Sequence, residues 1–229
     1  MIVPLVKENT WLEALQTLPA WLPTTAPVVI VSPHPDDETL GTGGFIASQR
    51  ARGIDVCVVA VTDGENAYSS SPGLGKLRKV EQEDALKCLG VPKQKIFRFG
   101  LPDSSVESRE SDLTEKLSRL VTANTYLIAP WKGDFHPDHQ ACGRAAEEVA
   151  RRNGAILVSY FFWTWHLGEP SLLAGMNMYR FPLDEEGLRS KGIALSRHRS
   201  QLIRTGEEPI LPERLLGPAR RPFEVFAFA

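Results

Sequence analysis

Two short stretches of this sequence carry side chains that bind metal ions and move protons. The first, residues 34–38, reads HPDDE and places three carboxylates directly behind a histidine. The second, residues 136–139, reads HPDH, so the two stretches hold three of the five histidines in the chain. Adjacent carboxylates repel one another unless a cation or solvent compensates their charge. The spacing therefore favours a cation bound between these two stretches.

Two histidines and one carboxylate are a common ligand set for a catalytic metal. Such a set holds Zn²⁺ and leaves a fourth position open for water. It also holds the iron of non-haem oxygenases, so the ligand types alone do not identify the metal. A simpler interpretation is that Asp36, Asp37 and Glu38 cap a helix, because acidic residues stabilise its first turn. Capping explains any one of these carboxylates, but it does not explain the histidines that accompany them.

The first two-thirds of the chain alternates β-branched runs with helical patterns, which predicts a parallel sheet covered by helices. The predicted strands are residues 28–32, 55–62, 96–99, 126–129 and 155–160. Apolar residues recur with the helical period within residues 77–89, 113–121 and 142–149. Each histidine stretch follows a predicted strand, and open α/β sheets bind ligands at the carboxyl ends of their strands. We therefore expect the two stretches to meet at one edge of the sheet.

The glycine-rich stretch at residues 41–44 does not match a dinucleotide-binding loop. Ile46 stands where the third glycine of GxGxxG is required. Three carboxylates immediately upstream would also oppose a pyrophosphate at the start of that helix. We therefore exclude NAD and FAD, and expect the glycines to let the helix backbone approach a strand or a ligand closely.

Beyond residue 160 the pattern changes to clustered aromatic residues at 161–165, followed by a candidate strand at 178–181. A last helix is predicted from Asp184, with one stripe formed by Leu188, Lys191, Leu195, His198 and Leu202. We interpret residues 1–229 as a single domain. Within it, residues 1–160 form a Rossmann-like α/β core and residues 161–229 form a small aromatic-rich C-terminal cap.

Composition supports a single globular α/β domain without strong charge. The chain has 229 residues, 42% of them hydrophobic and 24% charged, which is enough to bury one sizeable core. The 26 basic and 28 acidic residues leave a net charge of −2, so we expect no nucleic-acid or anionic-membrane partner.

The lack of a recognisable targeting signal and the spacing of the cysteines lead us to expect a cytoplasmic protein. The longest aliphatic run, residues 28–31, is far shorter than the roughly 20 residues of a membrane span, and no secretory signal is recognisable. The cysteines are odd in number and widely separated, which predicts neither disulfides nor a CxxC metal site. We expect all three to be buried packing residues, namely Cys57, Cys88 and Cys142.

The two histidine motifs, taken with four weaker ones, resemble the PIG-L/LmbE-like family of zinc-dependent de-N-acetylases. The weaker motifs follow in order along the chain: TDGE at 62–65, Arg78-x-x-Glu81, Pro102-Asp103 and His198-x-Ser200-Gln201. Members act on N-acetylglucosaminyl phosphatidylinositol, mycothiol and bacillithiol precursors, chitin-derived sugars and glycopeptide antibiotics. The resemblance spans most of the chain, but it does not select one substrate. Relatives often assemble as trimers or hexamers, so a homo-oligomer is one expectation.

Carried over position by position, the resemblance implies one zinc ion per chain. Its ligands would be His34, Asp37 and His139, and Asp36 would be the general base. Adjacent carboxylates in a non-helical turn can point in different directions, so Asp37 can face the ion while Asp36 reaches a water bound to it.

The resemblance also implies how the tetrahedral oxyanion is held. His136 would stabilise it, and Asp138 would hydrogen-bond His136 and orient its ring. Collapse of that intermediate would release acetate and a free amine. Either Asp36 or His136 protonates the leaving amine, and the sequence does not decide between them.

Four further residues are candidates for contact with a sugar substrate, namely Arg78, Asp63, Asp103 and His198. Arg78 alternatively forms a surface ion pair with Glu81, and the two aspartates alternatively organise turns. Three tryptophans either stack on a sugar ring or pack in the core: Trp131, Trp163 and Trp165.

These observations predict a zinc-dependent hydrolase that removes an acetyl group from an N-acetylglucosamine-type small molecule or glycoconjugate. One alternative is a non-haem iron enzyme using the same ligands, although the βα alternation differs from the all-β scaffold usual for that chemistry. The other is a non-catalytic, metal-containing sugar-binding relative. The presence of Asp36, His136 and Asp138 weighs against it, because binding alone needs no base.

Overall fold

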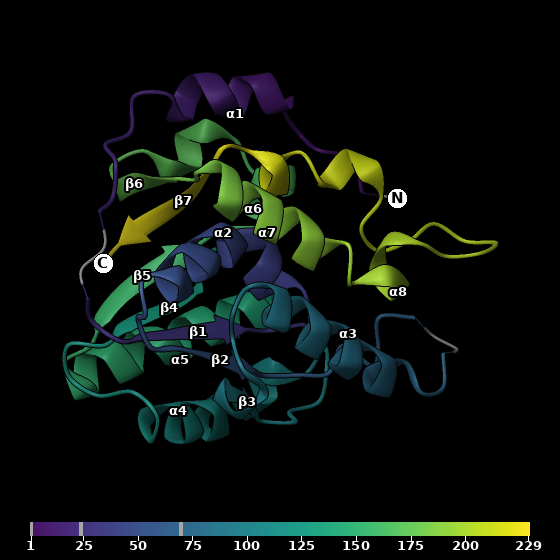
Figure 1. The fold of residues 1–229 in the computed structure, drawn as a ribbon, viewed down its shortest axis with the longest axis horizontal. Helices are drawn as coiled ribbons and strands as arrows, with labels where there is room; N and C mark the ends of the chain where they lie inside the picture. Colours follow the sequence, from purple (N-terminus) through teal and green to yellow (C-terminus); the bar gives the residue numbers. More distant parts are fainter. Residues whose placement is uncertain (1, 23–24, 69–70) are drawn as a thin grey trace.

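The computed structural model describes residues 2–22, 25–68 and 71–229, and a seven-stranded sheet lies at its centre (Figure 1). The strands are β1 Val28–Ser32, β2 Val56–Ala60, β3 Ile96–Arg98, β4 Tyr126–Pro130, β5 Ile156–Tyr160, β6 Asn177–Pro182 and β7 Phe223–Phe228. Their order across the sheet is β3-β2-β1-β4-β5-β7-β6. The first five pair in parallel, and β7 runs antiparallel to both of its neighbours. The mostly parallel α/β sheet expected from the sequence is confirmed.

Helices cover both faces of this sheet. The α-helices are α1 Glu8–Leu15, α2 Asp37–Ala51, α3 Leu74–Cys88, α4 Glu110–Ser118, α5 Pro137–Asn153, α6 Thr164–Leu167, α7 Glu185–Leu195 and α8 Arg199–Leu202. Short 3₁₀ turns are η1 Lys93–Lys95, η2 Val106–Arg109, η3 Pro170–Leu173, η4 Glu213–Leu215 and η5 Pro218–Arg220. In Figure 1, α4 and α5 lie on one side of the parallel strands, and α2 lies on the other side with α7 packed against it.

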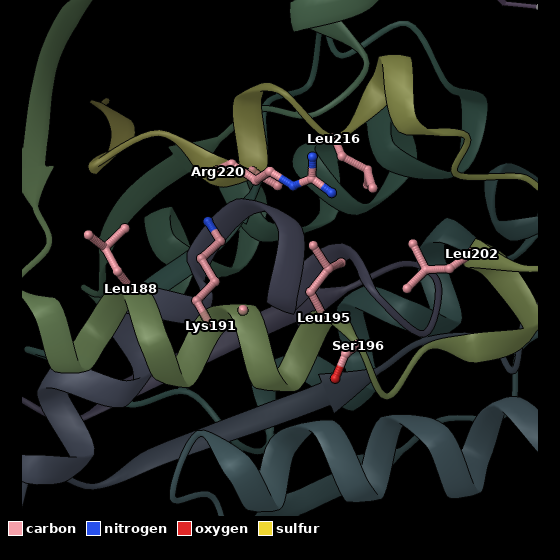
Figure 2. Close-up of a pocket in the computed structure, with 9 residues that line it drawn as sticks. Leu188, Lys191, Leu195, Ser196, Leu202, Leu216 and Arg220 are labelled. Carbon is pink, nitrogen blue, oxygen red and sulfur yellow. The ribbon is translucent and has the colours of Figure 1, made fainter.

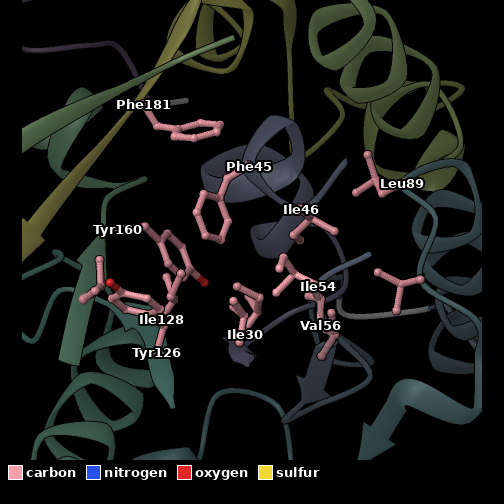
Figure 3. Close-up of a cluster of buried hydrophobic side chains, with 14 of the residues drawn as sticks. Ile30, Phe45, Ile46, Ile54, Val56, Leu89, Tyr126, Ile128, Tyr160 and Phe181 are labelled. Atoms are coloured by element: carbon pink, nitrogen blue, oxygen red, sulfur yellow. The ribbon is translucent and has the colours of Figure 1, made fainter. Parts of the chain in front are cut away.

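The sequence of β1 explains why both faces are covered. All five of its residues are buried, and successive side chains of a strand point to opposite faces. Val29 and Val31 pack in the cluster that includes α4 and α5. Val28 and Ile30 pack in the opposite cluster, where Phe45 and Ile46 of α2 point toward the strands (Figure 3). Burying one such aliphatic or aromatic side chain contributes about 1.5–3 kcal/mol.

The glycines at the start of α2 allow close packing against protein. A Cβ on Gly41 would lie 2.4 Å from the ring of Tyr160, which is fully buried and donates a hydrogen bond to the Val31 carbonyl. A Cβ on Gly44 would lie 2.4 Å from Leu183. Of the two expectations for this stretch, close approach to a strand is therefore the one that the structure confirms.

The C-terminal segment contributes strands to the central sheet. Residues 161–229 supply β6 and β7, so the sheet continues past residue 160, and the sequence did not predict β7. The predicted long helix from Asp184 was also too long, because α7 ends at Leu195 and α8 begins only at Arg199. Lys191 does face inward, where its Nζ lies 2.7 Å from the buried Glu224 carboxylate.

The expected burial of the three cysteines is confirmed for one of them. Cys142 is buried, but Cys57 and Cys88 are only partly buried, so the expectation for these two was wrong.

Within the described part of the chain, no helix has the length and apolar character needed to cross a bilayer.

The close contact at Gly41 gives a stability prediction. Gly41→Ala places a methyl group against the Tyr160 ring, which is enclosed by the core and has no room to move. We therefore expect the free energy of unfolding to decrease by about 1–3 kcal/mol. Urea denaturation measures this loss. Gly192→Ala in α7 is the matched control, because its Cβ would meet no atom within 4 Å and should stabilise the helix by about 0.5–1 kcal/mol. A Gly41→Ala protein as stable as wild type would contradict the tight packing.

A buried histidine makes stability depend on pH. His166 is 1% exposed, and burial lowers its pKa to about 4. Unfolded histidine has a pKa near 6.5, so between pH 6.5 and 4 the unfolded state binds a proton that the folded state does not. Stability therefore falls as the pH drops through this window, by up to about 3 kcal/mol at 1.36 kcal/mol per pKa unit.

His166→Phe removes the imidazole that binds this proton and keeps an aromatic ring beside Phe162. Relative to wild type, we expect this variant to gain unfolding free energy as urea titrations move from pH 6.5 to pH 5, and to show a constant difference between pH 8 and pH 7. A difference between the two proteins that is the same at every pH would show that His166 does not carry this dependence.

Candidate metal centre and active site

The chemistry-bearing residues collect where the strand order of the sheet reverses. From β1 the chain proceeds to β2 and β3 on one side, whereas β4 and β5 lie on the other. Open α/β sheets bind ligands in the crevice at such a switch point. Residues 34–38 follow β1 and residues 131–139 follow β4, so both enter this crevice.

The turn after β1 is held in place by buried hydrogen bonds. Glu38 is fully buried, and its Oε2 accepts hydrogen bonds from Ser32 Oγ at 2.5 Å and Gln82 Nε2 at 3.1 Å. Gln201 donates to the Pro35 carbonyl. Asp36 has a φ of 153°, which is costly for a residue with a side chain and persists only where the surroundings enforce it. Strain of this kind is typical of functional sites.

Two histidine nitrogens converge on one carboxylate oxygen. His34 Nδ1 and His139 Nε2 each lie 3.2 Å from Asp37 Oδ2. Tetrahedral zinc with bonds near 2.1 Å places its ligand atoms about 3.4 Å apart, so this spacing fits a metal centre. His139 is fully buried, and its Nε2 has no hydrogen-bond partner among the described residues. An orphaned ring nitrogen facing a buried carboxylate suits a divalent cation.

The charges around His139 also favour a cation. Burial alone would lower the pKa of this histidine, but Asp37 and Asp134 outweigh it and raise the pKa to about 9. Burial likewise opposes ionisation of Asp37, but His139 and His34 hold its pKa below the usual range. A metal ion and a proton therefore compete for the same imidazole.

Asp138 supports His34 and not His136, which corrects the sequence-based expectation. Its carboxylate accepts hydrogen bonds from the backbone N–H of Ser104 at 2.8 Å and of Val106 at 3.1 Å. The same carboxylate lies 3.1 Å from His34 Nε2. The two loop amides draw the side chain away from His136, whose Nδ1 accepts the backbone N–H of Asp138 at 3.2 Å and not its carboxylate.

His136 is neutral and faces the crevice. Burial, with the neighbouring His34 and His139, lowers its pKa to about 4. Because Nδ1 accepts a hydrogen bond, the neutral ring carries its proton on Nε2. The indole of Trp163 stacks on this imidazole with ring centres 5.9 Å apart and planes 19° apart.

Asp36 lies beside these groups and is 5% exposed. Burial and the adjacent Asp37 raise its pKa well above the ordinary value, although Arg78 opposes the shift. A carboxylate with a raised pKa is a better proton acceptor near neutral pH.

Asp134 is a buried residue of this site that the sequence analysis missed. Its Oδ2 lies 2.8 Å from His139 Nδ1, and its carboxylate also accepts the backbone N–H groups of residues 162–164. The residue stands outside the HPDH motif, two positions before His136. Its place in the loop after β4, at the ligand-binding edge of the sheet, is the signal that could have identified it.

A hollow of about 110 Å³ joins these residues. It is lined by His34, Asp36, Asp37, Ala67, Arg78, Asp103, Ser104, His136, Phe162, Trp163, Gln201, Ile210 and Leu211. Among the expected substrate contacts, Arg78 and Asp103 are therefore at the site. Arg78 is 2% exposed, and its Nε and Nη2 have no hydrogen-bond partner within the described residues. The alternative pairing with Glu81 is not seen, because Glu81 accepts hydrogen bonds from Ser200.

The other two expected contacts lie away from the hollow. Asp63 pairs with Lys79 of α3 at 2.9 Å, because its loop directs it toward that helix. His198 is fully buried in the break between α7 and α8, with Nε2 3.1 Å from Thr39 Oγ1. Both positions indicate structural contacts.

Of the three tryptophans, Trp163 alone lines the hollow. Trp165 packs edge-on against Trp11, with ring centres 4.9 Å apart. Trp131 packs against Phe161, with ring centres 5.8 Å apart. The packing interpretation therefore describes these two.

A second hollow, of about 280 Å³, opens between α7 and the C-terminal turns (Figure 2). Leu188 and Leu195 line it from α7, and Leu216 and Arg220 face them. None of the described residues that line it is a histidine or a carboxylate. The chemistry therefore belongs to the smaller hollow at the sheet edge.

The chain is similar in sequence and fold to known proteins. Residues 29–150 match the family model PIG-L, GlcNAc-PI de-N-acetylase. A probable N-acetyl-α-D-glucosaminyl L-malate deacetylase 2 of Bacillus subtilis is 30% identical over 129 residues, covering 52% of this chain and 58% of that protein. The diacetylchitobiose deacetylase of Thermococcus kodakarensis is 33% identical over 127 residues, covering 51% of this chain and 46% of that protein.

The solved structures agree on the fold. The crystal structure of the A40926 pseudoaglycone deacetylase superposes with a TM-score of 0.65 at 22% identity, covering 90% of this chain and 97% of that one. The match to the curated relatives is more restricted, since the chain spans less than two-thirds of the length of the two described above. The family model nevertheless covers more than half of the chain, including both histidine motifs, and the chain therefore belongs to the PIG-L family.

Proposed function

We propose that this protein is a zinc-dependent amide hydrolase that removes an acetyl group from an N-acetylglucosamine-type sugar derivative. The observation that carries the proposal is the convergence of His34 Nδ1 and His139 Nε2 on Asp37 Oδ2. The named relatives are deacetylases of N-acetylglucosaminyl malate and of diacetylchitobiose, which supports the class of substrate.

Three side chains would hold the metal, namely His34, Asp37 and His139. A zinc ion bound by them activates water at neutral pH and polarises a carbonyl oxygen. Asp138 contributes by fixing the ring of His34, because its carboxylate lies 3.1 Å from Nε2. A carboxylate in this position orients a ligand histidine and increases its basicity.

Asp36 is positioned to be the general base. It lines the hollow next to Asp37, and its raised pKa favours acceptance of a proton from the attacking water. The proton then becomes available for the amine that leaves with the sugar, while the acyl group departs as acetate. General base catalysis of this kind contributes about 10²- to 10⁴-fold in rate.

His136 supplies the hydrogen bond for the developing oxyanion. Its neutral ring carries a proton on Nε2, and the stacked Trp163 fixes the plane of the ring. Arg78 and Asp103 line the hollow and are then candidates to contact the sugar hydroxyl groups, since two Arg78 guanidinium nitrogens have no hydrogen-bond partner among the described residues.

The decisive experiment is acetate release by zinc-loaded protein from a panel of N-acetylated sugars, including N-acetylglucosamine and diacetylchitobiose. We expect wild type to hydrolyse at least one of them, whereas Asp36→Asn retains zinc by elemental analysis and loses at least 10²-fold in kcat. Asp55→Asn is the control, because its carboxylate lies on the surface beside Lys95. Full activity in Asp36→Asn would exclude Asp36 as the base, and iron in place of zinc in the active protein would overturn the metal assignment.

A second variant separates the oxyanion contact from metal binding. His136→Ala removes one hydrogen-bond donor and no proposed metal ligand, so we expect kcat to fall about 10²- to 10³-fold with zinc content unchanged. Steady-state kinetics paired with elemental analysis measures both quantities. Unchanged kcat, or loss of the zinc itself, is the result that would refute this role.

A further inference from the structure

We infer that Asp134 is a positioning residue that directs the Nε2 lone pair of His139 toward the metal ion. The inference rests on the proposed function, because it assumes that His139 is a metal ligand. It assigns a role to a residue outside both histidine motifs.

Among the described residues, the backbone and hydroxyl partners of this carboxylate all donate hydrogen bonds to it. Its Oδ1 accepts from Thr164 Oγ1 at 2.6 Å and from Thr164 N at 2.7 Å. Weaker contacts come from the backbone N–H groups of Phe162 and Trp163, at 3.2–3.4 Å. Asp134 itself is fully buried. A carboxylate whose oxygens both face donors acts as a hydrogen-bond acceptor toward each of them.

An acceptor-only carboxylate determines where the histidine carries its proton. His139 Nδ1 lies 2.8 Å from Asp134 Oδ2, so Nδ1 must be the protonated nitrogen when the ring is neutral. The lone pair then resides on Nε2, which points toward Asp37 and has no hydrogen-bond partner in the described part of the chain. Asp134 therefore stabilises the tautomer that can bind a metal, through its hydrogen bond with Nδ1, the ring nitrogen that does not face the metal.

The same carboxylate also holds the wall of the hollow. Phe162 and Trp163 line the hollow, and their backbone N–H groups donate to Asp134. Trp163 in turn stacks on His136. One buried side chain thus positions a metal ligand together with the turn that bounds the substrate space.

Asp134→Asn tests the inference because it changes charge and donor pattern but hardly changes size. The amide oxygen can satisfy the backbone donors only if its NH₂ group turns toward His139 Nδ1. That arrangement favours the opposite tautomer, with the proton on Nε2. We expect the zinc affinity to fall about 10- to 100-fold, measured by competition with a chromophoric chelator.

Glu81→Gln is the matched control. Glu81 is also buried, and it accepts the backbone N–H and the hydroxyl of one residue, Ser200, much as Asp134 does with Thr164. It contacts no proposed ligand, so its variant should bind zinc like wild type. Near-UV circular dichroism and a melting curve establish that each variant is folded.

The outcomes separate the two proposals. If wild type itself binds no zinc, the proposed function fails and the inference fails with it. If wild type and Asp134→Asn bind zinc equally while both are folded, only the inference is overturned. An equal loss in Glu81→Gln also overturns it, because any buried carboxylate would then have the same effect.

A measurement on the wild-type protein covers the case in which Asp134→Asn does not fold. In zinc-loaded protein with ¹⁵N-labelled histidine, we expect His139 to coordinate through Nε2 and to show an Nδ1–H protected from solvent exchange. The signal is assigned by its loss in His139→Gln. Coordination through Nδ1, or a rapidly exchanging Nδ1 proton, would refute the role of Asp134.

Discussion

Charge compensation at a buried carboxylate governs the architecture of this site. Asp37 is 2% exposed and has Asp36 and Glu38 as neighbours, so three acidic side chains are removed from water at the start of one helix. Burying charges is costly unless they are paired and hydrogen-bonded. Glu38 is satisfied by Ser32 and Gln82, and Asp37 faces two imidazoles, whereas the positive charge of Arg78 only partly offsets the raised pKa of Asp36. Each carboxylate of the motif therefore has its own form of compensation.

Two further carboxylates stand behind the two histidines. Asp138 contacts the outer nitrogen of His34, and Asp134 contacts the outer nitrogen of His139. In each pair the outer nitrogen is occupied, which leaves the inner nitrogen to face Asp37. Hydrogen-bonded carboxylates behind ligand histidines are a general feature of metal sites, where they fix the ring and its tautomer. The two pairs come from loops after different strands, so the folded sheet is needed to assemble them.

Much of this arrangement was predictable from the sequence, because strand ends in a parallel sheet share one edge. The strands before His34 and His136 were recognisable from β-branched runs, and their convergence followed from that rule. The partner of Asp138 was not predictable, since it depends on amides in the loop at Ser104 and Val106, which no periodicity specifies. The burial of His198 likewise depends on where α7 ends. Contacts fixed by loops and helix ends require the tertiary structure.

The position of β7 has a consequence for how the molecule is assembled. This strand separates β5 from β6, so β5 has an open edge until residues 223–228 insert beside it. Unpaired strand edges are templates for pairing with other chains. A polypeptide stopped before residue 223 would already contain both histidine motifs, yet it would expose that edge to intermolecular association. Formation of the far C-terminal strand thus protects a molecule whose two histidine motifs lie much earlier in the chain, at residues 34–38 and 136–139.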